Sequence, residues 1–265
     1  MHAPRHGRSL TGDVRLLEGF RSEALGNDRD VLVWLPPGYE HDQARRFPVL
    51  YLHDGQNVFD TSTSFAGTEW GVDETAERLV HEGRVAPLII VAINHAGARR
   101  ADEFAPTRDV HRHAGGQATE YARFVVDELK PWIDGRFRTR PEAAHTAIGG
   151  SSLGGLVTLH IGLEYPATFG ALAVMSPSIW WDRRAVLTRV EGLSARLPWR
   201  IWLDVGTAEG RDTVRNARAL KGVLMAKGWH TGADLHYLEA QDAPHSESAW
   251  ADRVAPLLEF LFPVR

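Results

Sequence analysis

The stretch from His145 to His160 constrains the fold more than any other part of the sequence. An apolar strand there runs into a glycine-lined turn and then into an apolar helix, and the turn reads Gly150-Ser151-Ser152-Leu153-Gly154. This is the G-x-S-x-G nucleophile elbow, in which a serine occupies a tight, strained strand-to-helix turn and the glycines leave room for the backbone. Ser152 is therefore the expected nucleophile. The helix that begins after it directs free N–H groups and its positive dipole end at a developing oxyanion.

The composition favours one large α/β domain. The chain has 265 residues, of which 43% are hydrophobic, and no low-complexity linker divides it, so we expect a single domain over residues 1–265. The formal charge of −4 leaves no basic excess to neutralise phosphates, which argues against nucleic acid as a partner. The absence of cysteine excludes disulfides, thiolate catalysis and cysteine-ligated metal.

The sequence also bears on the location of the protein. The segment Met1–Leu10 has basic residues but no apolar stretch behind them, which is not typical of a secretory signal. No apolar run approaches the length needed to cross a bilayer. We therefore expect a cytoplasmic protein that has no membrane partner, and the sequence predicts no particular oligomeric state.

Strand-like and helix-like segments alternate along the chain. Apart from the elbow, we expect strands at 14–20, 29–37, 47–53, 87–93, 169–176, 199–205 and 233–238, and helices at 69–80, 120–133, 211–227 and 248–262. Asn27-Asp28 is the expected turn between the first two strands, and the polar stretch 94–117 has the aperiodic pattern of a long loop. This alternation predicts an α/β fold with a doubly wound, mostly parallel sheet and helices on both faces, whose ligands bind beyond the carboxyl ends of the strands.

A serine hydroxyl is a weak nucleophile at neutral pH, so it needs a base within hydrogen-bond reach and an acid that orients the base. Where this elbow occurs, both partners follow the serine along the chain. His245 is the favoured base because it lies in the loop after the last expected strand and directly before the closing helix. The other histidines after the elbow are His160, His230 and His236, which lie in the elbow helix or in and before that strand; an ordinary surface histidine is the alternative for His245.

The acid is sought in the loop after the strand 201–205. Glu209 lies there, past the carboxyl end of the strand, at a place from which a carboxylate reaches a histidine ring. Asp212 is the alternative, and Asp204 lies inside the strand. We therefore expect Glu209 to be the acid.

Two backbone N–H groups are expected to form an oxyanion hole. One belongs to Leu153, the residue after the nucleophile, and the other comes from the loop Asp54-Gly55-Gln56. In that loop Gly55 permits an unusual backbone conformation, and Gln56 is the expected donor.

Six segments together resemble one family. They are His53-Asp-Gly-Gln-Asn-Val-Phe59, Glu69-Trp-Gly-Val-Asp-Glu74, Gly149-Gly-Ser-Ser-Leu-Gly-Gly155, Ser176-Pro-Ser-Ile-Trp-Trp-Asp182, Asp204-Val-Gly-Thr-Ala-Glu209 and His245-Ser-Glu-Ser-Ala-Trp250. In this order they resemble the putative-esterase (esterase D-like) family of α/β-hydrolases, which includes enterochelin esterases, S-formylglutathione hydrolases, feruloyl and acetylxylan esterases, and mycolyltransferases. The resemblance extends over about residues 14 to 262.

The resemblance implies an α/β-hydrolase fold and a role for each candidate residue. Ser152 would be the nucleophile, His245 the base, Glu209 the acid, and Gln56 and Leu153 the oxyanion donors. The sequence departs from the family in two respects: it lacks the additional N-terminal domain of full-length enterochelin esterases, and it has a glutamate where many members have an aspartate.

Several further residues are candidates for binding. Trp180 and Trp181 follow the carboxyl end of a strand, where they would wall an acyl or alcohol pocket for an aromatic or sugar-like group; core packing is the alternative. Arg99, Arg100 and Arg108 are better explained as a solvated face than as an attractor of an acidic substrate.

The segment His111-Arg-His113 has the spacing of two metal ligands on a strand, but no third ligand is in view, so we expect neither a metal nor a cofactor.

The sequence thus predicts a serine carboxylesterase that works through an acyl-enzyme on small or medium soluble esters, of feruloyl, acetyl or siderophore-like type. An acyltransferase with the same residues and a non-catalytic binding protein on the hydrolase fold are the alternatives. The fold and the triad do not select the leaving group.

Overall fold

A computed structural model of the chain describes residues 10–264. Nearly all of the segment Met1–Leu10, on which the prediction about a secretory signal depends, lies outside the described residues. Along the described part of the chain no helix is both long enough and apolar enough to cross a membrane.

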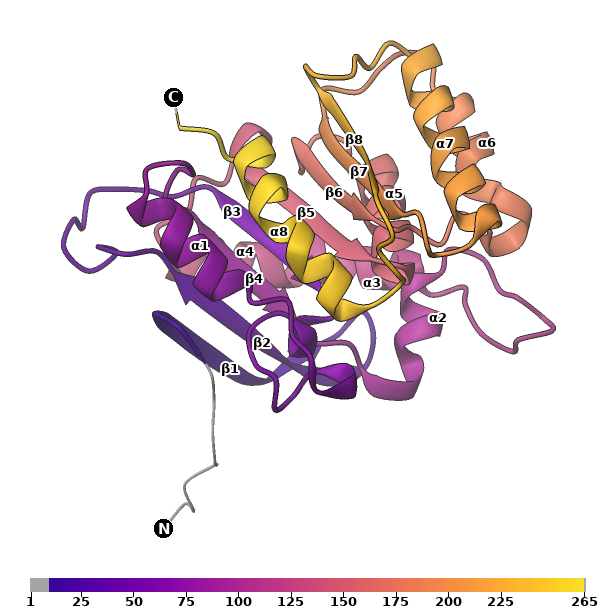
Figure 1. The fold of residues 1–265 in the computed structure, drawn as a ribbon. Helices are drawn as coiled ribbons and strands as arrows, with labels where there is room; N and C mark the ends of the chain where they lie inside the picture. Colours follow the sequence, from indigo (N-terminus) through magenta and orange to yellow (C-terminus); the bar gives the residue numbers. More distant parts are fainter. Residues whose placement is uncertain (1–9, 265) are drawn as a thin grey trace.

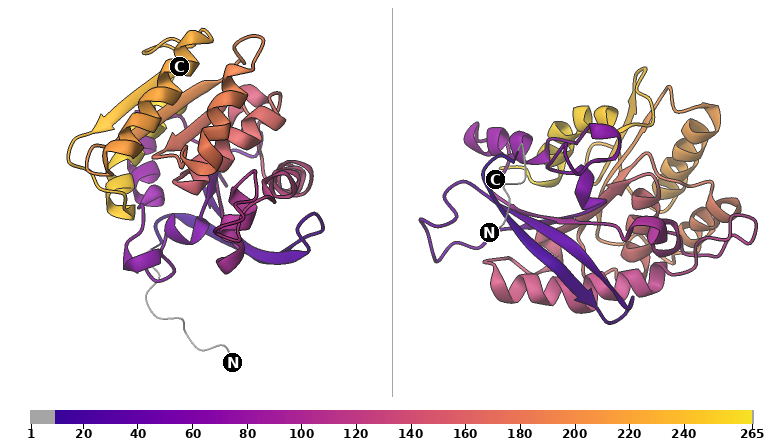
Figure 2. Two further views of the ribbon diagram at one scale, coloured as in Figure 1. Left: turned by 90° about the vertical axis from the view of Figure 1, so that its right-hand side faces the viewer. Right: turned by 90° about the horizontal axis from the view of Figure 1, so that it is seen from below.

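The centre of the fold is an eight-stranded sheet in the order β1-β2-β4-β3-β5-β6-β7-β8 (Figure 1). Its strands are β1 Asp13–Ser22, β2 Asn27–Leu35, β3 Val49–His53, β4 Ile89–Ile93, β5 Thr146–Ser151, β6 Ala171–Met175, β7 Arg200–Gly206 and β8 Leu235–Ala240. The strand β2 is antiparallel to both β1 and β4, and all other neighbours are parallel. The predicted mostly parallel sheet is confirmed, with the β1–β2 hairpin at one edge (Figure 2).

Helices cover both faces of the sheet, as the alternating pattern predicts. They are α1 Val72–His81, α2 Arg100–Phe104, α3 Ala118–Arg123, α4 Lys130–Arg136, α5 Leu153–Glu164, α6 Ala185–Glu191, α7 Arg211–Ala226 and α8 Glu247–Leu261. Short helical turns are η1 Gly55–Asn57, η2 Phe65–Gly67, η3 Gly97–Arg99, η5 Ala143–His145 and η6 Trp181–Arg184, and η4 Phe124–Leu129 is a π-helical segment that joins α3 to α4.

Two large clusters of buried side chains, and a small one between β7 and α7, join the helices to the sheet. On one face, α1 and α8 pack side chains such as Leu79 and Leu258 against the strands, and these helices lie in front of the sheet in Figure 1. On the other face, α2 to α7 contribute a larger cluster that includes Tyr121 and Leu156. The central strands β3 and β4 are buried along their whole length, which explains why they appear in the sequence as unbroken apolar runs.

Two sequence expectations about loops are wrong. Asn27 and Asp28 belong to β2, and the chain reverses just before them, at Gly26, whose φ of +64° suits glycine. The stretch 94–117 is not all loop, because it contains α2, which is too short to produce a recognisable helical period. The helix expected at 120–133 is present and continues from Ala118 to Arg136 through the π-helical segment.

The topology brings six loops to the end of the sheet where the parallel strands finish. The parallel strands β4, β3, β5, β6, β7 and β8 are neighbours in that order, so their carboxyl ends lie side by side. Chain segments that are far apart in the sequence therefore meet at this end.

Candidate active site

The turn between β5 and α5 has the strained geometry of a nucleophile elbow. Ser152 has φ 60° and ψ −120°, a backbone conformation that L-residues rarely adopt. The turn is closely packed: a Cβ on Gly150 would lie 3.1 Å from the side chain of His53. The elbow thus holds the Ser152 side chain at the carboxyl edge of the sheet, just before the first residue of α5.

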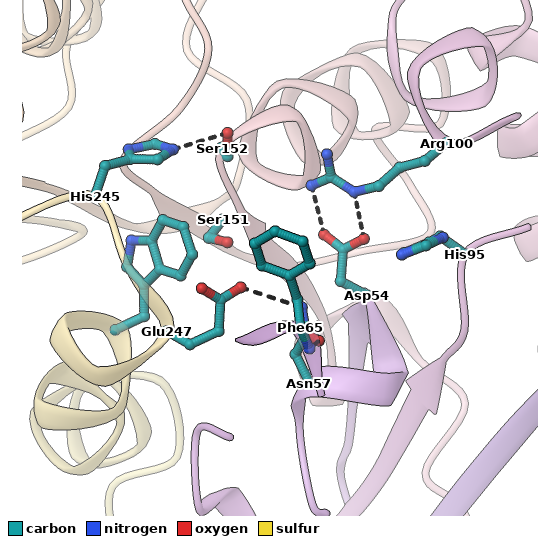
Figure 3. Close-up of a pocket in the computed structure, with 10 residues that line it drawn as sticks. Asp54, Asn57, Phe65, His95, Arg100, Ser151, Ser152, His245 and Glu247 are labelled. Atoms are coloured by element: carbon teal, nitrogen blue, oxygen red, sulfur yellow. Dashed lines mark hydrogen bonds and ion pairs between the residues drawn. The ribbon is translucent and has the colours of Figure 1, made fainter. Parts of the chain in front are cut away.

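Two hydrogen bonds connect the three residues that the sequence singles out (Figure 3 shows the first). Ser152 Oγ lies 3.0 Å from His245 Nε2, and His245 Nδ1 lies 2.7 Å from Glu209 Oε2. A base that contacts the hydroxyl and a carboxylate that orients the base are the arrangement a serine nucleophile requires.

The alternative histidines are engaged elsewhere. His160 Nδ1 contacts an Arg189 Nη1 at 2.6 Å, and burial lowers the pKa of His160 to about 4. His236 stacks on Trp202 with ring centroids 4.3 Å apart. No hydrogen bond within residues 10–264 joins His160, His230 or His236 to Ser152.

Glu209 is buried beneath the histidine and is hydrogen-bonded through both carboxylate oxygens. Oε1 accepts hydrogen bonds from Ser176 Oγ at 2.5 Å and from the Gly206 N–H at 2.7 Å, while Oε2 contacts His245. Burial by itself pushes the pKa of Glu209 upward, but the hydrogen bonds from His245, Ser176 and Gly206 outweigh it and lower the pKa below its ordinary value. The Glu209 carboxylate is therefore ionised near neutral pH.

The alternative acid, Asp212, lies at the start of α7. Its side chain is 82% exposed and pairs with Arg215, at 2.9 Å. The structure thus brings Glu209, and not Asp212, to His245.

A buried polar network supports Glu209 from below. Arg253 donates to Asp204 Oδ1 at 2.7 Å, and a second nitrogen of its guanidinium lies 3.8 Å from Glu209 Oε1. Trp250 donates through its indole N–H to Ser176 Oγ at 3.0 Å, which in turn donates to Glu209. Sequence reasoning missed Ser176 and Arg253 in this role, and the only available signal was the position of Arg253 on the helix that follows His245.

The loop after β3 lies next to the elbow and carries the second expected oxyanion donor. The unusual backbone is at Asp54, with φ 57°, and not at Gly55 as expected. Gly55 is needed for space, because a Cβ there would lie 2.6 Å from the carbonyl carbon of Ala92. Gln56 belongs to η1 and Leu153 begins α5, so both N–H groups are in first turns, where a helix provides no acceptor.

A pocket of about 390 Å³ opens at Ser152 and His245 (Figure 3). It is lined by Asp54, Asn57, Phe65, His95, Arg100, Ser151, Ser152, His245, Glu247 and Trp250. Arg100 forms two hydrogen bonds to the Asp54 carboxylate, at 2.6 and 2.8 Å. Burial holds the pKa of His95 below its ordinary value, so this imidazole is neutral near pH 7.

Sequence reasoning and structure differ on the pocket walls. Neither Trp180 nor Trp181 lines this pocket. Trp181 is 4% exposed and donates to the Thr107 carbonyl, and Trp180 lies on the surface beside Arg112. Arg100, expected on a solvated face, is instead a pocket residue.

Carboxylates and histidines that suit a metal lie away from the pocket. Oxygens of Glu69, Asp73 and Glu74 lie within 4.8 Å of one another, the one group of three or more such ligands found in residues 10–264. His111 and His113 lie on an exposed loop and belong to no such group. None of these residues lines the pocket.

Known proteins with similar sequences include named esterases. Over 201 residues the chain is 26% identical to the uncharacterized protein YbbA of Bacillus subtilis, covering 74% of this chain and 75% of YbbA. It is 31% identical over 166 residues to an endo-1,4-beta-xylanase/feruloyl esterase of Xylanibacter ruminicola, covering 59% of this chain and 20% of that protein. It is 28% identical over 162 residues to the ferri-bacillibactin esterase BesA of Bacillus subtilis, covering 55% of this chain and 52% of BesA. The chain thus matches about half or less of the length of the two named esterases.

A solved structure and a family model agree with these relatives. The BES protein from Bacillus cereus superposes with a TM-score of 0.77 at 22% identity, over 100% of both chains, which shows the shared fold. The model of the family described as "Putative esterase" matches residues 22–261. The chain therefore belongs to the putative-esterase family of α/β-hydrolases and is an ester hydrolase.

Proposed function

We propose that the protein is a serine carboxylesterase that works through an acyl-enzyme, with Ser152 as nucleophile, His245 as base and Glu209 as acid. The observation that carries this proposal is the continuous contact from Ser152 Oγ through the His245 ring to Glu209, with distances of 3.0 and 2.7 Å. The pocket that opens at the same serine gives an ester access to it.

Each step follows from these contacts. Ser152 Oγ attacks the ester carbonyl carbon while His245 Nε2 accepts the hydroxyl proton, and the Glu209 carboxylate stabilises the imidazolium that results. The Gln56 and Leu153 N–H groups would donate to the negative oxygen of the tetrahedral intermediate. His245 then gives its proton to the departing alcohol, leaving an acyl-Ser152 ester. His245 then deprotonates a water molecule, which attacks the acyl carbon. As the carbon–Oγ bond breaks, the proton passes from His245 to Ser152 Oγ and the carboxylic acid leaves.

The proposed substrates are small or medium soluble esters. A pocket of about 390 Å³ that opens to the surface suits an acyl or alcohol group of that size. Feruloyl-type and siderophore-like esters are the substrates that the names of the relatives suggest.

The test compares the wild-type protein with Ser152→Ala on a panel of p-nitrophenyl and feruloyl-type esters. We expect the wild type to hydrolyse several of them and the variant to lose at least a factor of about 10³ in kcat/KM, since the nucleophile is gone. Mass spectrometry of the wild type after rapid mixing should detect the acyl adduct. A Ser152→Ala variant that keeps its activity would contradict the assignment.

Added alcohol separates hydrolysis from acyl transfer. If methanol or glycerol captures the acyl group far better than water does, the alternative acyltransferase activity replaces hydrolysis as the proposal.

That residues 1–265 form one catalytic domain, in the cytoplasm, stays a prediction. The single continuous sheet supports its first part.

A further inference from the structure

The pocket contains one carboxylate that the proposed mechanism does not use. Glu247 is the first residue of α8, two positions after His245, and its half-buried side chain points into the pocket toward Phe65 and Asn57 (Figure 3). Its Oε1 accepts a hydrogen bond from Asn57 Nδ2 at 3.2 Å. This neutral amide is itself held in place, because its oxygen accepts the Phe65 N–H at 2.8 Å.

The charge of Glu247 is not balanced by another pocket residue. The one lysine or arginine that the described residues place in the lining, Arg100, is engaged by both oxygens of Asp54. No ion pair joins Glu247 to a lysine, arginine or histidine in residues 10–264, and His95 is neutral near pH 7. Burial and the nearby Asp54 raise the pKa of Glu247 above its ordinary value, while Arg100 and His245 act in the opposite direction. Apart from Asp54, which is paired with Arg100, Glu247 is the one carboxylate that residues 10–264 contribute to the pocket lining.

The pocket that contains this carboxylate is also lined by an exposed aromatic side chain. Phe65 lines the same pocket and is 74% exposed, although large apolar side chains are usually covered. A carboxylate next to an open aromatic face is the chemistry that recognises an ammonium group, through an ion pair and a cation–π contact. An anionic ester group, by contrast, would be repelled by Glu247 and would find Arg100 already paired.

We propose that the pocket takes esters that carry an ammonium group near the scissile bond, and that Glu247 is the residue that selects this charge. This inference rests on the proposed esterase function and narrows its substrates. The ammonium group would lie between the Glu247 carboxylate and the Phe65 ring, while Ser152 attacks the neighbouring carbonyl.

The experiment uses matched esters that differ only in charge. On the acyl side these are the p-nitrophenyl ester of γ-trimethylammonio-butyric acid, its neutral isostere with a tert-butyl group in place of the trimethylammonium group, and the anionic p-nitrophenyl hemiglutarate. On the alcohol side they are acetylcholine and its neutral tert-butyl isostere. The kcat/KM of each is measured for the wild type, Glu247→Gln and the control Asp252→Asn. The control removes the same charge from an exposed position on the same helix, outside the pocket.

In at least one set we expect the wild type to prefer the cationic ester over its neutral isostere by about fivefold or more, the upper range for a partly exposed ion pair. Glu247→Gln should bring that ratio close to one, and Asp252→Asn should leave it unchanged. The preference of the wild type should also decline when salt rises from about 20 to about 500 mM. If Glu247→Gln does not fold, this salt dependence of the wild-type preference tests the inference by itself, and a preference that does not change with salt overturns it.

Two other outcomes separate the two proposals. If the wild type hydrolyses the neutral esters but prefers a cation in neither set, or if Glu247→Gln keeps the preference, the inference is overturned while the esterase function stands. If the wild type hydrolyses none of the five esters, or Ser152→Ala hydrolyses them as fast, the proposed function itself fails.

Discussion

Glu209 shows what one additional methylene group permits at the proposed catalytic acid. Many members of the family have an aspartate at this position, whereas here the longer side chain reaches His245 with one oxygen and Ser176 and Gly206 with the other. Each oxygen thus has its own partners, and the carboxylate plane is fixed by groups at both ends. The contacts with Ser176 and Gly206 therefore hold the Glu209 carboxylate in place without the help of His245.

The role of this residue is tested by substituting the two candidate acids in parallel. Glu209→Gln keeps the size of the side chain but removes the charge and allows the wrong histidine tautomer, so kcat/KM should fall by about 10²- to 10⁴-fold. Asp212→Asn changes an exposed side chain that is distant from His245, and it should leave kcat/KM within about twofold. Equal losses in the two variants, or a loss in Asp212→Asn alone, would count against Glu209.

At the scale of single elements, the first turn of α1 has an unusual acid. The helix begins at Val72, three residues later than the start expected at Glu69, and this places Asp73 in the interior. Asp73 accepts the Thr11 N–H, but burial raises its pKa to about 8 and the neighbouring Glu74 acts in the same direction. The helix dipole, which normally favours an ionised acid in a first turn, is outweighed by burial here.

A pH dependence of stability follows from this shift. The ordinary pKa of an aspartate is 3.8, so between pH 3.8 and about 8 the folded state holds the Asp73 proton more tightly than the unfolded state. The contribution of this proton to the free energy of unfolding is fully present below pH 3.8 and is lost as the pH rises toward 8. The side chain of Asp73→Asn is always neutral. At pH 8 the melting temperature of this variant should thus be at least about 2–4 °C above that of the wild type, which is equivalent to about 1 kcal/mol. At pH 5 the two melting temperatures should be much closer. Thermal melts across this range, with Asp252→Asn as control, measure the difference; a pH-independent difference would contradict the interpretation.

The central strand β5 allows a second test at this scale. A Cβ on Gly149 would lie 2.3 Å from the Cβ of Ala173 on β6, so Gly149→Ala should destabilise the protein by about 1–3 kcal/mol. Gly222 lies exposed in α7 with open space around it, so Gly222→Ala should stabilise it by about 0.4–1 kcal/mol. Urea unfolding of both variants gives the two free energies, and the same sign for both would refute the packing argument.

At the scale of the whole molecule, the sequence predicts the sheet and the residues at the strand ends better than the pocket. Strand-end positions are predictable because parallel neighbours place their carboxyl ends together, which brings Glu209 and His245 to Ser152. The same reasoning does not predict that Phe65 and Arg100 line the pocket. They come from aperiodic loops or very short helices, whose paths depend on tertiary contacts such as the pair between Arg100 and Asp54.

The order of the elements has a consequence for protein synthesis. Ser152 and the histidine that it contacts are 93 residues apart in the sequence, and α5, β6, η6, α6, β7, α7 and β8 lie between them. A chain that leaves the ribosome from its N-terminus exposes the elbow long before the imidazole arrives. At about 5–20 residues per second this interval lasts about 5–20 seconds. If the proposed mechanism holds, a nascent polypeptide therefore cannot hydrolyse an ester until translation has passed His245.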